Sequence, residues 1–124
     1  MPTTDPNTNF DAYADDYISG VVDTLEEYAR QIKAGDYEDE PYTEDGGSIY
    51  EYGLDLVVAV GRPVTWLLGC GGPTTYVEWD AAFPMRGTIT HAWGGKSKTV
   101  AVQWDVSETL FDYLATPVID SMEY

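Results

Sequence analysis

The stretch FDAYADDYISGVVDTLEEYARQIKAG, residues 10–35, decides the architecture of this chain. Its apolar residues recur at steps of four and three, the spacing that gathers side chains on one face of an α-helix. They are Phe10, Ala14, Tyr17, Val21, Leu25, Tyr28 and Ile32. The spacing predicts a long amphipathic helix over residues 10–34, whose apolar face must be covered by another layer of the fold.

The flanks of this stretch carry the residue types that begin and end helices. Thr8 or Asn9 can cap the start, and Gly35 suits the C-cap. Asp11 in the first turn and Lys33 in the last turn have the charges that the helix dipole favours. The preceding residues 1–9 are polar and contain two prolines, which predicts a flexible N-terminal tail.

Beyond residue 46 the sequence changes to β-type segments separated by turn residues. The segments are SIYEYGLDLVVAVG (48–61), PVTWLLG (63–69), TTYVEWD (74–80), RGTITHAW (86–93) and KTVAVQWD (98–105). CGGP at 70–73 predicts a turn, and Gly94-Gly95 with Lys96 predicts a hairpin connection. YVEWD and VQWD both end in Trp-Asp, which we interpret as similar strand-to-turn chemistry.

The C-terminal stretch VSETLFDYLATPVIDSMEY, 106–124, predicts a short helix capped by Ser107, with Leu110, Phe111 and Leu114 on its apolar side. Pro117 is expected to break or kink it. The fold class is therefore α+β: a long N-terminal helix, a four- to five-stranded antiparallel sheet and a short C-terminal helix, in a single domain over residues 10–124.

Composition excludes several classes of protein. Among 124 residues there is one cysteine, Cys70, so an intramolecular disulfide is impossible and a cysteine-based zinc cluster is not expected. No run approaches the roughly 18 apolar residues of a membrane span, and the N-terminus lacks the features of a signal peptide. We expect a cytoplasmic protein that does not bind membranes.

Charge is the most unusual property of the chain. The formal net charge is −16, which disfavours direct binding to nucleic acid or to anionic membranes and favours a basic partner. Residues 1–45 hold thirteen acids against two basic residues, whereas residues 46–124 hold nine acids against four. Because adaptation to high salt would acidify the whole surface, this imbalance favours a specific acidic face.

The segment DYEDEPYTED, residues 36–45, has six carboxylates and partly matches a calcium-binding loop. Asp36, Glu38 and Glu40 alternate as the ligands of an EF-hand loop do. Pro41 stands where that loop requires glycine, and Gly47 stands where it requires the bidentate glutamate. We therefore predict no dedicated metal site and no cofactor, although loose binding of divalent cations by the carboxylates is expected.

Two pairs of residues offer possible catalytic chemistry. Glu78 and Asp80 lie on the same side of one predicted strand and could act as a carboxylate pair. Cys70 and His91 are the sole cysteine and histidine, but the strong negative charge opposes the thiolate that such an enzyme needs. We predict no catalytic residue and no enzyme, and a small carboxylate enzyme or metal-binding domain stays an alternative.

The outer side of the predicted helix is acidic at a cost in stability. Asp11 with Asp15 and Asp23 with Glu27 are like-charged pairs at i,i+4, each worth a few tenths of a kcal/mol of repulsion. Only Glu26 with Arg30 compensates in the favourable order. Such tolerance of repulsion indicates that the negative field is useful, and a solvated helix face is the competing interpretation.

The spacing of these carboxylates approaches that of a nucleic-acid backbone. Residues three or four apart on a helix have Cβ atoms about 5–6 Å apart, and a DNA strand rises about 3.4 Å per phosphate. Tyrosines are interleaved with these acids, namely Tyr37, Tyr42, Tyr50 and Tyr52. They add the rigid contact area typical of protein interfaces. The predicted partner-binding residues are Asp15, Asp16, Asp23, Glu26, Glu27, Asp36, Tyr37, Glu38, Asp39, Glu40, Tyr42, Glu44 and Asp45.

A short acidic chain with a charged helix and loop resembles the nucleic-acid mimics of phages and mobile elements, namely anti-CRISPR and anti-restriction proteins. WLLGCGGPTTYVEWD and the later HAWGG also resemble small accessory proteins of such elements; this likeness covers residues 54–95 and carries no catalytic motif. The resemblance implies a non-enzymatic, phage-encoded inhibitor in the host cytoplasm, bound to a basic nucleic-acid-binding complex such as a CRISPR effector. An acidic interaction module of a halophilic or mobile-element protein, without mimicry, stays an alternative.

Overall fold

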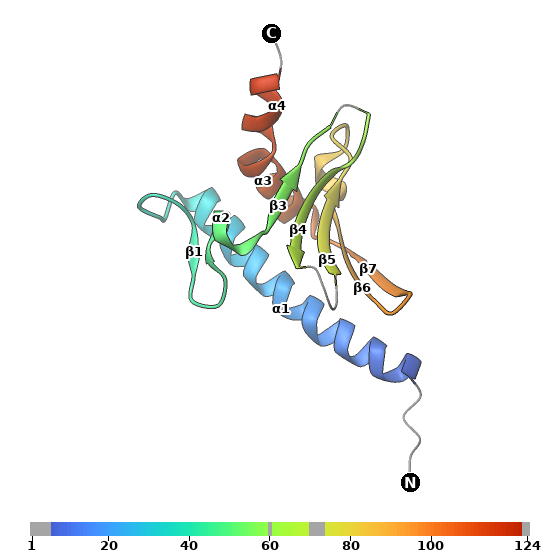
Figure 1. Cartoon of the computed structure of the whole chain (residues 1–124). Coiled ribbons are helices and arrows are strands. Elements are labelled where there is room, and N and C mark those ends of the chain that lie inside the picture. The colour runs from blue at the N-terminus through green and yellow to red at the C-terminus, as the bar shows by residue number, and fades with distance from the viewer. Residues whose placement is uncertain (1–5, 60, 70–73, 123–124) are drawn as a thin grey trace.

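The computed structural model describes residues 6–59, 61–69 and 74–122, with side chains from residue 12 onward. A long helix, α1 (Pro6–Ala34), crosses one side of a five-stranded antiparallel sheet, and two further helices follow the sheet in sequence (Figure 1). The predicted α+β class is confirmed. The predicted turn at 70–73, and Cys70 with it, lies outside the described residues.

Helix α1 begins at Pro6, four residues earlier than predicted. Proline suits the first helical position because its φ is already helical and its missing N–H would have no partner there. Residues 6–9 therefore belong to the helix and not to a tail, and Asp11 lies beyond the first turn. On the apolar face Ala14, Val21, Leu25 and Tyr28 are buried as expected.

The apolar face of α1 differs from the prediction at one position. Tyr17 is 45% exposed, and its neighbour Ile18 fills the core instead. The Tyr17 ring stacks on the imidazole of His91 with centroids 4.8 Å apart, so the tyrosine covers the edge of the core.

The main sheet is a meander in which each strand pairs with the next. Its strands are β3 (Asp55–Val57), β4 (Val64–Gly69), β5 (Thr74–Trp79), β6 (Thr88–Trp93) and β7 (Lys96–Ala101). Gly94 and Gly95, with φ of +61° and +80°, form the two-residue turn between β6 and β7, a conformation that side chains disfavour. Lys96 is the first residue of β7 and not part of the turn.

Two segments predicted as strand contain helix. Residues Ile49–Tyr52 form a short helix, α2, because the Ser48 hydroxyl accepts a hydrogen bond from the Tyr50 N–H and caps it. Helix α3 (Trp104–Leu114) begins at the Trp-Asp pair that was expected to end a strand. Its N-cap residue is Gln103, so the prediction of a Ser107 cap is wrong.

Helix α4 (Thr116–Met122) follows α3 after Ala115. Pro117 lies in its first turn, where it interrupts the helical path as predicted. A short 3₁₀ turn, η1 (Pro84–Arg86), connects β5 to β6. In the ranges that the structure describes, no helix combines the length and apolarity needed to cross a membrane.

A chain of aromatic rings runs through the core between the sheet and the helices. Phe111 of α3 contacts Trp79, Trp79 stacks on Trp66, and Tyr52 links Trp66 to Tyr28 of α1, with successive centroids 5.6–6.5 Å apart. Aromatic pairs at this separation stabilise a core beyond their buried area. The core therefore ties α1, α2 and α3 to one face of the sheet.

Candidate acidic interaction surface

The outward side of α1 carries a stripe of carboxylates. Asp16, Asp23 and Glu27 stand seven and four residues apart, so they lie above one another along the helix. Asp15 and Glu26 border this line on the same side, and four of the five residues are exposed, with Glu27 half-buried. The core residues of α1 occupy the opposite side.

The segment after α1 folds back as a two-stranded hairpin, β1 (Tyr42–Thr43) and β2 (Gly47–Ser48), which the sequence did not predict. Buried Gln31 holds it to α1: its Nε2 donates to the Tyr42 carbonyl at 2.7 Å, and its Oε1 accepts from the Tyr42 N–H at 2.9 Å. The Tyr28 hydroxyl donates to the Gly47 carbonyl at 2.8 Å.

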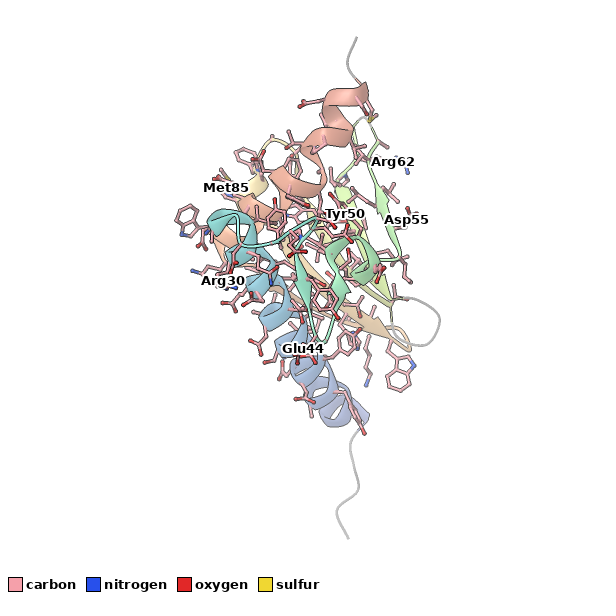
Figure 2. The ribbon with its side chains drawn as sticks, turned by 90° about the vertical axis from the view of Figure 1, so that its left-hand side faces the viewer. Arg30, Glu44, Tyr50, Asp55, Arg62 and Met85 are labelled. Atoms are coloured by element: carbon pink, nitrogen blue, oxygen red, sulfur yellow. The ribbon has the colours of Figure 1, made fainter. Side chains whose placement is uncertain are left out.

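Close packing at the hairpin requires glycine at position 46. A Cβ there would lie 2.5 Å from the Tyr28 hydroxyl and 2.8 Å from the Tyr52 ring. The hairpin is thus docked on α1, and its tip residues Glu44 and Asp45 are exposed. Figure 2 marks Glu44 at the tip of the hairpin.

One residue joins the helix stripe to the hairpin. Besides its bonds to Tyr42, Gln31 Nε2 donates to Glu27 Oε2 at 2.9 Å. The structure therefore brings the two predicted groups of acids, one on α1 and one in 36–45, together along the same side of the molecule. We call this combined area the acidic surface.

Three of the predicted acids are neutralised by basic residues. Arg30 NH2 lies 2.7 Å from Glu27 Oε2, and Arg30 NH1 lies 3.6 Å from Asp36 Oδ2. Lys98 of β7 pairs with Asp15. The expected pairing of Arg30 with Glu26 is wrong, because the guanidinium turns to Glu27 at i,i+3.

Arg30 and Gln31 also set the charge state of Glu27. Their hydrogen bonds to the carboxylate lower the pKa of Glu27 to about 2. Glu27 is therefore ionised throughout the physiological pH range, and so is the Arg30 guanidinium beside it.

Eight of the predicted acids make no ion pair among the described residues. They are Asp16, Asp23, Glu26, Glu38, Asp39, Glu40, Glu44 and Asp45. A shallow groove of about 460 Å³ lies between α1 and the 36–42 segment, with Arg30 and Gln31 on its helix side. Of the predicted tyrosines, Tyr42 is 60% exposed beside this groove, and Tyr37 is half-buried.

The opposite face of the sheet has a different chemistry. The strand register places Leu67, Tyr76, Thr90 and Thr99 in one row across it, and Thr65, Glu78, Thr88 and Ala101 in the next. In the described strands this face holds two acids, Asp55 and Glu78, and no lysine or arginine. The unneutralised charge is therefore concentrated on the helix-and-hairpin side.

Glu78 and Asp80, the possible carboxylate pair, do not form one site. Glu78 lies on the outer face of β5, whereas Asp80 follows the strand and accepts a hydrogen bond from the Ala82 N–H at 2.9 Å, which fixes the turn. His91 is buried, with Nδ1 2.8 Å from the Thr75 hydroxyl, and burial lowers its pKa. In the described ranges no three His, Cys, Asp or Glu side chains meet as metal ligands.

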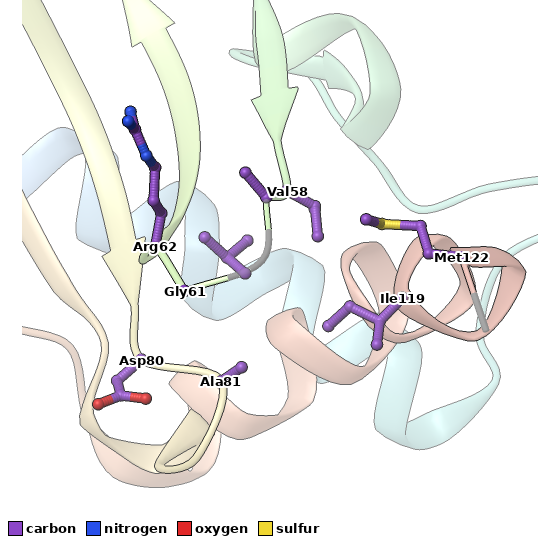
Figure 3. A pocket seen from close by; sticks show the side chains of 9 residues that line it. Val58, Gly61, Arg62, Asp80, Ala81, Ile119 and Met122 are labelled. Atoms are coloured by element: carbon purple, nitrogen blue, oxygen red, sulfur yellow. The ribbon is translucent and has the colours of Figure 1, made fainter.

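A further hollow lies apart from the acidic surface. It measures about 530 Å³ and is bounded by the β3–β4 connection, the end of β5 and α4. Figure 3 shows Val58, Ile119 and Met122 turned toward one another across it, while the charged ends of Arg62 and Asp80 point away. Its described lining is mostly apolar, and the charged groups of Arg62 and Asp80 at its edge are not directed into it.

Two features of the surface were missed from sequence. In the sequence, Gln31 resembles any polar residue on the surface of a helix. Its apolar neighbours Tyr28 and Ile32 were the one signal that its side chain is buried. Tyr50 and Tyr113 come together from α2 and α3, a contact between distant segments that no local pattern encodes.

Comparison with protein-family models, with curated proteins and with solved structures finds no match to this chain.

Proposed function

We propose that this protein is a non-enzymatic inhibitor that occupies the basic nucleic-acid-binding site of a host defence complex, such as a CRISPR effector. The observation that carries the proposal is the acidic surface: eight carboxylates without an ion pair in the described residues, presented by α1, the 36–41 segment and the hairpin docked on α1. A Lys/Arg channel that accepts a phosphate backbone is electrostatically complementary to such a surface.

Preorganisation supports the same proposal. The hairpin is fixed by Gln31 and Tyr28, so Glu44 and Asp45 at its tip need little ordering when a partner binds. Exposed Tyr42 supplies amphipathic contact area beside the charges. The uneven charge of the two sides also favours a specific face over a general adaptation to salt, which would acidify the outer face of the sheet as well.

The test is capture of purified CRISPR effectors of several types by the immobilised protein. The hairpin variant carries Glu38→Gln, Asp39→Asn, Glu44→Gln and Asp45→Asn. A charge-matched control carries Asp55→Asn, Glu78→Gln, Asp80→Asn and Asp120→Asn, which removes four charges outside the acidic surface.

Mimicry predicts that one effector is captured by the wild type and by the control, is lost with the hairpin variant, and is released by its target DNA. Equal loss of capture with both variants would mean that capture depends on net charge alone. Capture that survives hairpin neutralisation would contradict the role of the acidic surface, and failure to capture any effector would count against a CRISPR partner.

A further inference from the structure

An aromatic pocket lies next to the acidic surface, at the junction of α1, α2 and α3. Its volume is about 450 Å³. Ile32 and Pro117 form its apolar edge, and Tyr50 and Tyr113 contribute their rings. It is separate from the groove along 36–42, although both lie at the same end of α1.

Three tyrosines from three segments meet here. The Tyr50 and Tyr113 rings have centroids 5.9 Å apart with planes inclined by 30°, and Tyr37 meets Tyr113 edge-on at 6.3 Å. Tyr50 is 59% exposed, so its ring is available to a ligand. Figure 2 marks Tyr50 near the middle of this side of the molecule.

Carboxylates surround the rings. Glu108 and Asp112, one turn apart on α3, line the same pocket, and both are exposed. Glu108 makes no ion pair among the described residues, and Asp112 Oδ1 accepts from the Thr116 hydroxyl at 3.1 Å. None of the described residues that line the pocket is a lysine or an arginine.

The Tyr113 hydroxyl stays neutral. Burial, a hydrogen bond to Tyr50 and the nearby charges of Tyr50, Tyr37 and Glu40 raise the pKa of Tyr113 well above its usual value. The pocket thus offers uncharged aromatic faces bordered by negative charge.

We infer that this pocket binds the guanidinium of an arginine side chain presented by a partner protein. Guanidinium is planar, stacks on aromatic faces and pairs with carboxylates through its N–H fork, which is the combination that Tyr50, Tyr113 and Glu108 supply. Placing that arginine in a nucleic-acid-binding channel rests on the proposed function, whereas the affinity of the pocket for guanidinium does not.

The test uses a small probe and the whole protein. N-acetylarginine methylamide is titrated into protein with ¹³C-labelled tyrosine rings, and the citrulline analogue, which has the same shape without the charge, is the control probe. We expect saturable shifts of the Tyr50 and Tyr113 resonances with arginine and none with citrulline.

Variants locate the site. Glu108→Gln with Asp112→Asn, and separately Tyr50→Ala, should each weaken arginine binding by about fivefold or more. Glu44→Gln with Asp45→Asn removes the same charge from the hairpin tip and should change it less than about twofold. All these side chains are exposed, so the variants should fold.

The inference is overturned if citrulline binds as well as arginine, if the hairpin-tip variant weakens binding as much as the pocket variant, or if Tyr13 and Tyr42 shift as strongly as Tyr50. Arginine binding without capture of any effector would overturn the proposed partner and leave the pocket standing.

Discussion

Ser107 holds together the junction of β5, η1 and α3. Its buried hydroxyl accepts hydrogen bonds from Trp79 Nε1 at 3.1 Å and from the Gly87 N–H at 2.8 Å, and it donates to the Pro84 carbonyl at 2.5 Å. One small side chain therefore satisfies two buried donors.

Replacing Ser107 by alanine should lower the free energy of unfolding by about 2–4 kcal/mol, because two buried N–H groups lose their acceptor. Urea denaturation measures this. Ser121→Ala is the control, since Ser121 is exposed on α4 and its loss should cost less than about 0.5 kcal/mol. A change at Ser107 no larger than the control would contradict the role of this hydroxyl.

His91 makes stability depend on pH. The imidazole is buried between Tyr17 of α1 and Thr75 of β5, and Lys98 is its cross-strand neighbour on β7. Burial lowers its pKa, so the folded state favours the neutral ring while the unfolded chain takes up a proton near the ordinary value of 6.5. Stability contributed by the neutral ring is present above that value and is lost as pH falls below it.

The free energy of unfolding should therefore decrease from pH 7.5 to 5.5, with a slope from this residue of at most about 1.4 kcal/mol per pH unit. Urea titrations across this range test the slope. His91→Gln should be flatter over the same interval, and an equal slope in both proteins would assign the pH dependence to other groups.

Residue-scale predictions from sequence succeed where a local pattern decides them. Val21 and Leu25 are buried because the helical period alone fixes their side. Ser107 was misassigned as a cap because its true partners lie 20 and 28 residues away.

At the scale of elements, the hairpin β1–β2 is the part of the acidic surface with the weakest intrinsic stability. Each strand has two residues, far too short to persist alone. Its attachment to α1 through Gln31 and Tyr28 keeps Glu44 and Asp45 in place.

Gln31→Ala should release the hairpin from α1. The Tyr42 N–H loses its acceptor, so we expect its amide hydrogen exchange to accelerate about tenfold or more, since about 1.4 kcal/mol of lost stabilisation gives that factor. Hydrogen exchange by NMR measures this directly. Lys33→Gln, which removes the 2.7 Å ion pair with Asp105, is the control and should leave Tyr42 protected.

The long helix, the meander order and the Gly94-Gly95 turn were predictable because periodicity and turn chemistry encode them. The structure of the segment 48–61 was not predictable in this way, because its residues IYEY have strand propensity. They form a helix because Ser48 caps it and Ile49 is buried. The start of α3 at Trp104 was not predictable either, because the strand-like alternation of Val100, Val102 and Trp104 continues from β7 across the boundary.

At the scale of the molecule, charge is separated between two sides. The helices, the 36–41 segment and the hairpin carry most of the unneutralised acids, and the outer face of the sheet is rich in threonine. A protein whose core contains a continuous aromatic chain can tolerate this repulsion without dense counterions.

We therefore expect the protein to stay folded at about 20 mM KCl and to gain only a few degrees in melting temperature at about 2 M, by screening of like charges. Thermal melts followed by circular dichroism measure this. A chain that unfolds when salt is withdrawn would instead support the halophilic alternative.

The acidic surface was predictable as a set of residues, and most of its members are exposed as expected. The arrangement of these residues in space was not predictable from sequence. The hairpin, the Lys98–Asp15 pair and the neighbouring aromatic pocket all depend on contacts between distant segments.

The most direct measurement is competition on a captured effector. The dissociation constant of the effector for its target DNA is measured at increasing concentrations of this protein and at two salt concentrations. Occupation of the DNA site predicts that the apparent constant rises in proportion to inhibitor concentration, and that the inhibitor's own affinity falls as salt rises. Unchanged DNA affinity with the inhibitor bound would contradict nucleic-acid mimicry.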